Sequence, residues 1–171
     1  MGVEARAAAS ARIAEVVNAM LAERAVDGIV ALYCAKGSEV GTTELDRAVR
    51  AAGRRVAYPR VGDGRALTFH TVGRDELAPG RFGLCEPAPQ AATVELAEIG
   101  AVVVPGLAFD HSGARIGWGR GHYDATLAAM PRAWRVGVAF ACQMVDELPN
   151  EPHDERMHVI VTEAATYVVG A

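Results

Sequence analysis

Residues 101–127 read AVVVPGLAFDHSGARIGWGRGHYDATL and combine an apolar run with a glycine-rich segment. The Ala-Val-Val-Val run at residues 101–104 is continuously apolar and largely β-branched, which is typical of a parallel strand covered on both faces. The Pro-Gly dipeptide that follows ends this strand. Glycines then alternate at positions 117, 119 and 121, and the apolar periodicity after them predicts a helix. The stretch therefore predicts a buried strand that a glycine-rich loop joins to the start of a helix.

The glycine loop has the composition of an anion-binding site. Glycine lets backbone amides approach a ligand closely or adopt positive φ, and such amides beside a helix N-terminus bind anions. Arg115 lies inside this loop, two residues before the first of these glycines, where a guanidinium can hold two phosphate oxygens. The alternatives are a simple tight turn for the glycines and a solvated surface position for Arg115. Polyphosphate is the first expected ligand.

The N-terminal third of the chain alternates helices and strands. Residues 29–33 predict a first buried strand, and residues 34–41 form the loop at its carboxyl end, where open α/β sheets bind ligands. Before that strand, one apolar stripe at i, i+3, i+4, i+7 and i+8 predicts a helix that begins near residue 4, with Ile13, Val16, Val17, Met20 and Leu21 facing the sheet.

A second helix and a second strand follow that loop. Thr43 and Asp46, three residues apart, predict a helix N-cap, and the amphipathic helix ends at Gly53. Residues 55–58 predict a strand that Pro59 ends. The order helix, strand, helix, strand with a parallel crossover predicts the α/β class.

The remaining pattern completes one domain. Residues 67–72 predict a strand, and the Gly- and Pro-rich residues 74–89 predict an inserted β-hairpin or lid. Further strands are expected at residues 135–140, 158–162 and 167–169, the last as an edge strand. We therefore expect a single α/β domain over residues 1–171, with an open, mainly parallel sheet and helices on both faces in three layers.

The composition excludes several classes of function. The chain is 51% hydrophobic and 22% charged, as expected of a globular protein, and its net charge of -4 excludes a general nucleic-acid binder. No apolar run approaches the roughly 18 residues of a membrane span, so no membrane partner is expected. The three cysteines, Cys34, Cys85 and Cys142, are far apart, which argues against a disulfide framework or a zinc site and favours a cytoplasmic location.

The string P-G-L-A-F-D at residues 105–110, followed by G-A-R-I-G-W-G-R-G-H-Y-D at residues 113–124, resembles the 5-formyltetrahydrofolate cyclo-ligase family. Members are also called methenyltetrahydrofolate synthetases. Four shorter matches fall in the family's order and extend the resemblance over roughly residues 10–165: E-V-G-T at residues 39–42, Pro59-Arg60, Glu86-Pro87, and P-H-D at residues 152–154.

The resemblance implies an ATP- and Mg²⁺-dependent ligase that cyclises 5-formyltetrahydrofolate to 5,10-methenyltetrahydrofolate and releases ADP and phosphate. Folate and ATP would be its partners, and the protein would be a monomer or a homodimer. Carried onto this sequence, the nucleotide site comprises Arg115, Gly117, Trp118, Gly119, Arg120, Gly121, His122 and Tyr123, of which Arg115 and Tyr123 are also catalytic. The folate site comprises Cys34, Glu39, Trp118 and Tyr123, and the magnesium ligands are Asp124 and Asp154.

Elementary chemistry agrees with two of these assignments. Mg²⁺ takes one or two carboxylates plus phosphate oxygens, and Asp124 directly follows the glycine loop. The alternative for Asp124 is a carboxylate that only complements the helix dipole. Glu39 suits the pterin because a carboxylate accepts hydrogen bonds from two adjacent N–H groups of an aminopterin ring. The alternative for Glu39 is an exposed loop glutamate.

The sequence departs from the family in its cations. Family members usually begin with a helix of the form K-x-x-x-R, whose cations reach the nucleotide. Here the N-terminal segment holds only Arg6 and Arg12, and Lys36 is the only lysine in the chain. Arg120, between two loop glycines, is the predicted compensating cation, with a solvent-facing arginine as the alternative.

Other positions also differ from the family string. Trp118 and His122 replace residues that are common there, and His158 stands where an aspartate is common. The histidines have no metal-ligand spacing and are expected to be structural or surface residues. A nucleotide- or folate-binding regulatory protein with weak or lost ligase activity is the alternative function. A sugar-phosphate isomerase or acyl-CoA transferase is a third.

Overall fold

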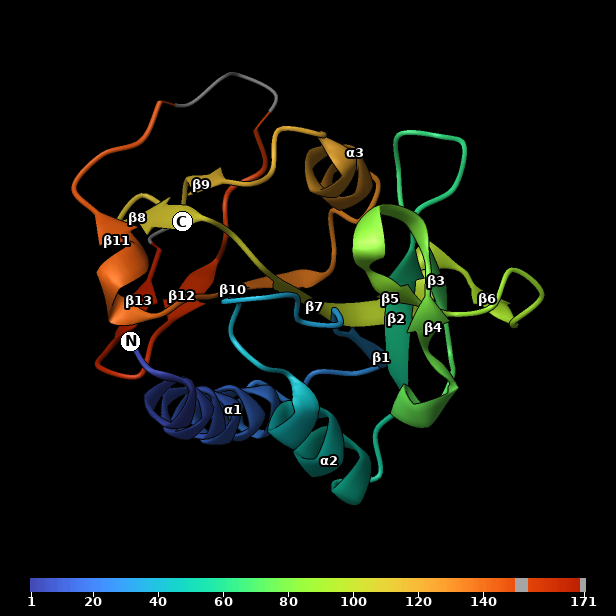
Figure 1. Cartoon of the computed structure of the whole chain (residues 1–171), viewed down its shortest axis with the longest axis horizontal. Coiled ribbons are helices and arrows are strands. Elements are labelled where there is room, and N and C mark those ends of the chain that lie inside the picture. Colours follow the sequence, from blue (N-terminus) through green and yellow to red (C-terminus); the bar gives the residue numbers. More distant parts are fainter. Residues whose placement is uncertain (150–153, 170–171) are drawn as a thin grey trace.

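An eight-stranded sheet forms the centre of the computed structural model, which describes residues 1–149 and 154–169 (Figure 1). The strand order is β13-β12-β10-β7-β1-β2-β3-β6. The inner strands are parallel: β1 (Ile29–Ala31), β2 (Val56–Arg60), β7 (Ile99–Val104), β10 (Trp134–Val138) and β12 (Val159–Val161). Antiparallel strands complete both edges: β13 (Thr166–Val168) on one side, and β3 (Thr68–His70) and β6 (Thr93–Val94) on the other.

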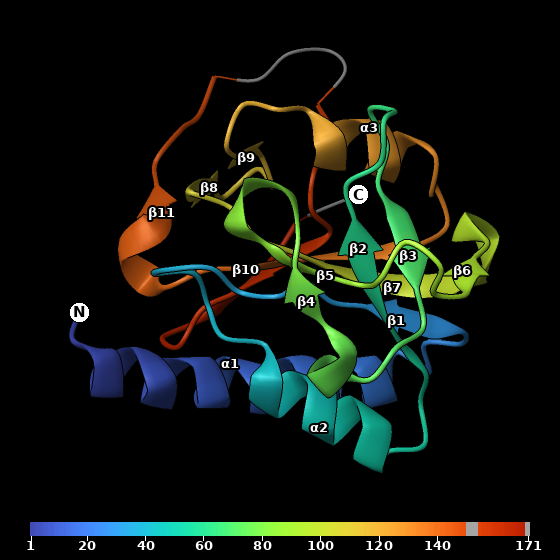
Figure 2. The same ribbon diagram turned by 45° about the vertical axis from the view of Figure 1, so that its right-hand side comes forward.

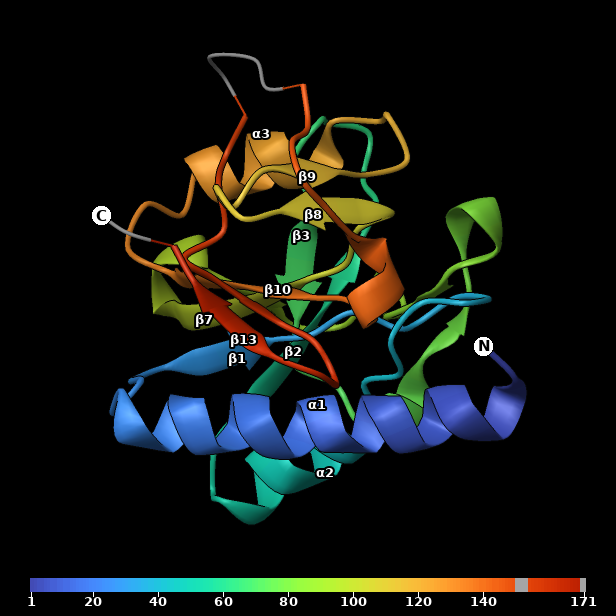
Figure 3. The same ribbon diagram turned by 90° about the vertical axis from the view of Figure 1, so that its left-hand side faces the viewer.

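Helices cover both faces of this sheet. The helices α1 (Val3–Glu23) and α2 (Thr43–Ala51) lie on one face, and Figure 3 shows α1 lengthwise beneath the strands. On the other face lie α3 (His122–Ala128) and a small sheet of β11 (Met144–Val145), β8 (Ala108–Asp110) and β9 (Arg115–Ile116) (Figure 1). The expected three-layer, mainly parallel α/β fold is confirmed.

The central strand β7 explains why its sequence is apolar at every position. Side chains of a strand alternate between the two faces. Ala101 and Val103 therefore pack into the core beneath α1 and α2, whereas Val102 and Val104 pack into the core beneath α3. Both faces are covered, so no position of the strand is left for a polar residue. On the helix side, the apolar stripe of α1 meets this sheet through its buried members Ile13, Val17 and Leu21.

A short antiparallel hairpin of β4 (Ala78–Pro79) and β5 (Cys85–Glu86) lies within the Gly- and Pro-rich segment, beside β2 (Figure 2). The buried carboxylate of Glu86 fastens the hairpin to the sheet. It accepts a hydrogen bond from the Val61 backbone N–H at 3.1 Å and lies 3.6 Å from the Arg60 guanidinium. Short 3-10 turns at Arg74–Glu76, Arg81–Gly83, Leu96–Glu98 and Ala141–Gln143 complete the secondary structure.

Three local expectations were wrong. The strand β7 does not run directly into the glycine loop, because β8 and β9 form a hairpin between them. The N-cap of α2 is Thr42 and not Thr43, and its hydroxyl donates to the Tyr33 carbonyl oxygen. Pro59 does not end β2, which continues to Arg60. The parallel pairing with β1 already stops at Ala57, so the missing Pro59 N–H costs that pairing nothing, and β3 pairs with the extension.

Candidate active site

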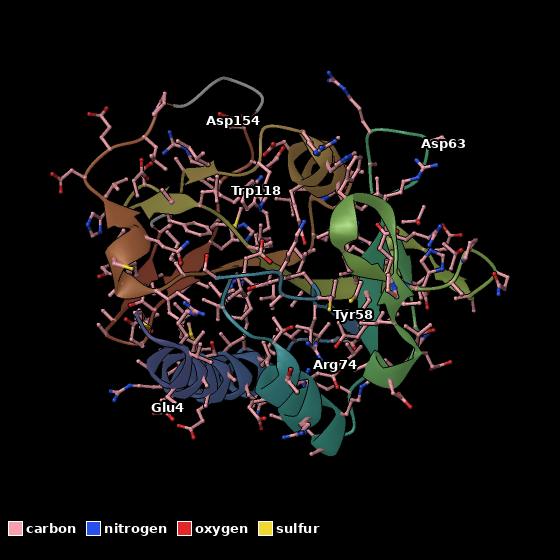
Figure 4. The ribbon with its side chains drawn as sticks, in the orientation of Figure 1. Glu4, Tyr58, Asp63, Arg74, Trp118 and Asp154 are labelled. Atoms are coloured by element: carbon pink, nitrogen blue, oxygen red, sulfur yellow. The ribbon has the colours of Figure 1, made fainter. Side chains whose placement is uncertain are left out.

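Two segments that follow the parallel strands β1 and β7 in the chain meet beyond the carboxyl ends of these strands. Residues 34–41 follow β1, and the glycine loop follows the β8–β9 hairpin, which comes after β7 in the chain and belongs to the small separate sheet. The contact between them joins residues 79 positions apart: the indole N–H of Trp118 donates to Glu39 Oε1 at 3.4 Å. Figure 4 shows Trp118 on the α3 side of the sheet, and Tyr58 and Arg74 nearer α2. The edge where an open α/β sheet binds ligands is therefore formed by the two predicted segments.

Arg115 is the buried cation of this edge. Its side chain is only 6% exposed, and its guanidinium Nη2 donates to Asp124 Oδ1 at 3.0 Å, while the Asp124 side chain is 27% exposed. The guanidinium carbon also lies 5.5 Å from the centre of the Tyr123 ring. The buried Nε of Arg115 has no hydrogen-bond partner among the described residues. Because an unpaired buried donor is costly, this nitrogen suits an oxygen of an anionic ligand.

The loop glycines serve two different purposes. A Cβ atom at Gly117 would lie 2.5 Å from Arg115 Nη1, so a larger residue there would push the guanidinium out of its present position. Gly119 and Gly121 have φ of 73° and 66°, the left-handed region that other residues rarely adopt. Gly117 therefore accommodates Arg115, and the two later glycines shape an open loop before α3.

Two tyrosines at this edge are held in their neutral form. Burial raises the pKa of Tyr123 well above its ordinary value, Arg115 opposes this shift, and Glu39 adds to it. Burial also raises the pKa of Tyr33, helped by Glu39 and Tyr123, and its hydroxyl donates to the Val40 carbonyl oxygen at 2.7 Å. A tyrosine that keeps its proton is a poor general base, and Tyr123 can instead donate a hydrogen bond.

The cysteine of the β1 loop is held as a thiol. Burial raises the pKa of Cys34, Arg74 lowers it, and Cys85 and Glu39 raise it further. Because the thiolate and not the thiol is the nucleophile, Cys34 has no activated form here. It can contact a substrate without reacting with it.

Residues 2–163 match the model of the 5-formyltetrahydrofolate cyclo-ligase family. The chain belongs to this family. A 5-formyltetrahydrofolate cyclo-ligase from Mycolicibacterium smegmatis is 34% identical over 157 residues, covering 87% of this chain and 81% of the relative. The enzyme of that name from Escherichia coli K12 is 31% identical over 146 residues, covering 81% of this chain and 79% of the relative.

Solved structures of methenyltetrahydrofolate synthetases share the fold of this cyclo-ligase family member. The NMR structure of the Aquifex aeolicus 5,10-methenyltetrahydrofolate synthetase aligns with a TM-score of 0.83 at 29% identity, covering 99% of this chain and 85% of that one. The Mycoplasma pneumoniae protein aligns with a TM-score of 0.77 at 21% identity, covering 95% of this chain and 90% of that one. The resemblance expected from the sequence motifs is confirmed.

The hairpin tip adds a contact to the candidate site that the sequence did not reveal. Phe82 lies in the turn between β4 and β5 with φ of 59° and is 49% exposed. The guanidinium carbon of Arg120 lies 3.6 Å from the centre of its ring, and Lys36 Nζ donates to its carbonyl oxygen. Two cations from different loops therefore converge on Phe82. The only local signal was the neighbouring Gly83, which marks a turn but not its partners.

His122 anchors the start of α3 to the segment that precedes β3. Its Nδ1 lies 2.8 Å from the Arg65 carbonyl oxygen, and in the next turn the Thr126 hydroxyl accepts a hydrogen bond from the Leu67 N–H. His111 is exposed and packs against the Tyr167 ring edge to face. His153 lies outside the described residues.

The two aspartates expected to bind magnesium come from different segments. Asp124 is at the start of α3, and Figure 4 shows Asp154 on the same side of the sheet as Trp118. Within residues 1–149 and 154–169 there is no group of three or more His, Cys, Asp or Glu side chains that could hold a metal ion. Pro152 and His153 of the P-H-D motif fall outside the described residues. None of the described helices has the length and apolarity that a membrane crossing needs.

Proposed function

We propose that the protein catalyses the ATP-dependent cyclisation of 5-formyltetrahydrofolate to 5,10-methenyltetrahydrofolate, with release of ADP and phosphate. The observation that carries the proposal is the meeting of a carboxylate loop with a glycine loop at the ligand-binding edge, through Glu39 and Trp118. The first loop offers an acceptor for a pterin, and the second offers a buried guanidinium for a phosphate. The two substrates would lie side by side, as transfer between them requires.

Glu39 is the proposed pterin-binding residue. One of its oxygens accepts the Lys36 backbone N–H at 2.8 Å, which orients the carboxylate toward the site edge. Adjacent N–H groups of an aminopterin ring can donate to such a carboxylate as a pair. Cys34, Tyr123 and Trp118 are the proposed neighbours of the bound folate.

Arg115 and the glycine loop are the proposed site for the ATP phosphates. The unpaired Nε of Arg115 can take a phosphate oxygen while Nη2 keeps Asp124. A guanidinium held by a carboxylate and by Gly117 arrives at the reaction already oriented, so little reorganisation is needed when charge moves. Gly119, Arg120, Gly121 and His122 are the proposed remainder of this nucleotide site.

The chemistry follows from these positions. The formyl oxygen attacks the γ-phosphorus of ATP and ADP leaves. N10 then attacks the activated formyl carbon, releases its proton to solvent, and phosphate leaves. Arg115 stabilises the charge on the transferred phosphoryl group, and the Tyr123 hydroxyl, held protonated, donates a hydrogen bond to a developing negative oxygen. No side chain forms a covalent bond with substrate, in keeping with the protonated thiol of Cys34.

Asp124 and Asp154 are the proposed magnesium ligands. Carboxylate oxygens are the ligands that Mg²⁺ prefers, and Asp124 uses only its Oδ1 for Arg115, so its second oxygen fits a metal ion. A bound Mg²⁺ would supply charge neutralisation for the phosphates. The cytoplasmic location and a monomeric or homodimeric state also belong to this proposal.

The proposal is tested by mixing the protein with ATP, Mg²⁺ and 5-formyltetrahydrofolate and following the absorbance of the methenyl product. We expect product formation that depends on ATP and is reduced in Glu39→Gln through a higher folate KM with nearly unchanged ATP binding. Folate and ATP binding by calorimetry without product would instead support the regulatory alternative, which the missing N-terminal lysine favours. No binding of either ligand would reject both.

A further inference from the structure

Trp118 is an exposed aromatic residue whose polar atom is nevertheless engaged. Its side chain is 72% exposed, and its indole N–H donates to Glu39 Oε1. The second tryptophan, Trp134, is 7% exposed and lies in the core below α1, under the Arg24 guanidinium. An exposed tryptophan offers a large apolar area to a ligand, and this one is tied to the carboxylate proposed for the pterin.

The indole provides Glu39 with the same kind of contact as the pterin would. The indole and the pyrimidine half of the reduced pterin are both flat rings with an in-plane N–H donor. Glu39 Oε2 is taken by the Lys36 backbone N–H, and Oε1 by Trp118. Each carboxylate oxygen has two acceptor sites, so a pterin that pairs with both oxygens can leave the 2.8 Å Lys36 bond in place, and the longer 3.4 Å indole bond is the one that it displaces.

The backbone around Trp118 allows that displacement. Glycines flank it on both sides, Gly119 has φ of 73°, and a methyl group placed on Gly119 would meet no atom within 4 Å. With 72% of the side chain exposed, little packing is lost when the indole turns. The only described hydrogen bond of the side chain is the one at 3.4 Å to Glu39, which is long and therefore weak.

We propose that Trp118 is an internal competitor for the pterin position: its indole N–H occupies Glu39 in the free protein, yields to the folate, and its ring then covers the bound substrate. The inference rests on the proposed assignment of Glu39 to the pterin. A ring without an N–H donor cannot replace the indole bond at Glu39, so Trp118 favours ligands that carry such a donor.

The free protein tests the first half of the inference without any substrate. The two indole N–H groups give two resonances in a ¹⁵N-labelled sample, and Trp134→Phe assigns them. We expect the Trp118 resonance to shift in Glu39→Ala and the Trp134 resonance to stay. Adding 5-formyltetrahydrofolate to the wild type should move the Trp118 resonance out of its Glu39-bound position. The proposal is overturned if the chemical shift of the Trp118 indole N–H is the same in Glu39→Ala as in the wild type, or if it does not change when folate binding is saturated.

Calorimetry of folate binding tests the competition itself. Trp118→Phe keeps a ring but loses the N–H, and loss of ring area affects binding whether or not Glu39 is present. A double-mutant cycle with Glu39→Ala removes that shared effect. For each background we take the ratio of the folate Kd with Trp118 to the folate Kd with Trp118→Phe. We expect this ratio to be roughly two- to tenfold larger when Glu39 is present than in Glu39→Ala, which corresponds to the loss of one hydrogen bond. Equal effects in the two backgrounds overturn the inference.

Two controls separate the possible failures. Tyr167→Phe removes a donor from an aromatic residue on the edge strand β13 and should leave folate affinity unchanged. Trp118→Ala should bind folate less tightly than Trp118→Phe, because no ring remains to cover the substrate; equal affinities would reject the covering role. If Glu39→Ala alone leaves folate affinity unchanged, the pterin assignment in the proposed function fails and the competitor fails with it. If Glu39→Ala weakens binding but the cycle shows no coupling, only the competitor fails.

Discussion

Arg115 and Arg120 lie five residues apart in the same segment, yet they are held in opposite ways. Arg115 is enclosed: Asp124, the Tyr123 ring and the backbone at Gly117 surround it, and its side chain is 6% exposed. Arg120 is exposed and rests on the Phe82 ring of a separate hairpin. A buried ion pair loses several interactions if it moves, whereas an exposed cation on a ring is stabilised by only about 0.5–1 kcal/mol.

The difference suggests a division of labour at the proposed phosphate site. Arg115 is fixed before the substrate arrives, which favours transition-state stabilisation. Arg120 and Lys36 are occupied by the hairpin tip and must be released before they can contact a phosphate. The first cation should then control turnover and the second should control ATP affinity.

The largest expected effect is that of Arg115→Lys. Lysine keeps the charge but loses the planar fork that holds Asp124 and a phosphate oxygen together. We expect kcat/KM to fall about a hundredfold, as expected from roughly 2.8 kcal/mol of lost charge-assisted contacts. Steady-state kinetics measures this, and thermal unfolding verifies that the variant is folded. A folded Arg115→Lys variant with wild-type kcat would show that Arg115 does not contribute to the chemical step.

Arg120→Ala should act on ATP affinity and not on folate. Loss of one charge-assisted contact, worth roughly 1.5–3 kcal/mol, should raise the ATP KM about ten- to hundredfold at saturating folate and fixed Mg²⁺. Arg132→Ala is the matched control, because Arg132 is also an exposed arginine beyond the end of α3. A change under about twofold in Arg120→Ala, the same as in the control, would show that Arg120 does not compensate for the missing N-terminal lysine.

Phe82→Leu should change the ATP KM in the opposite direction to Arg120→Ala. The substitution keeps an apolar side chain at the hairpin tip but removes the ring beneath Arg120. Because Arg120 no longer has to leave a cation–π contact of about 0.5–1 kcal/mol, the ATP KM should fall by about two- to fivefold. Parallel measurements in the Arg120→Ala background should show no such fall. A fall of equal size in both backgrounds would mean that Phe82 acts on ATP by another route.

The smallest effect is on stability and lies away from both arginines. Burial lowers the pKa of His158 below its usual 6.5, with Arg135 and Arg24 adding to the shift and Glu155 opposing it. The unfolded chain therefore binds the proton more readily than the folded one, so the free energy of unfolding should decrease as the pH falls below about 6.5. His158 Nδ1 also accepts the Arg135 backbone N–H at 3.0 Å, a bond that protonation breaks. Denaturant unfolding between pH 5 and pH 8, roughly the range where histidine titrates, should show a flatter profile in His158→Gln than in the wild type.

The sequence predicted the framework of the fold because the signals for it are local. Strand β7 and helix α1 were expected within a few residues of their ends, since burial of both faces of a strand and of one stripe of a helix leaves a periodic pattern. The glycine loop and its arginine were also expected, because the alternating glycines and Arg115 are visible in one short stretch of sequence. The errors at Thr43 and Pro59 arose where a distant partner changed the local preference: the Tyr33 carbonyl for the Thr42 hydroxyl, and β3 for the end of β2.

By itself, the sequence determined the class of fold, the family motifs and the chemical types of the candidate site residues. The tertiary structure alone decided which of them meet. Glu39 contacts Trp118 across 79 residues, and Arg120 contacts Phe82 on a hairpin inserted between two strands. Neither contact leaves a periodic pattern in the sequence. Both contacts depend on how the parallel sheet brings the ends of non-adjacent segments to one edge. The sequence specifies the type of each side chain, whereas tertiary packing determines which other side chains it contacts.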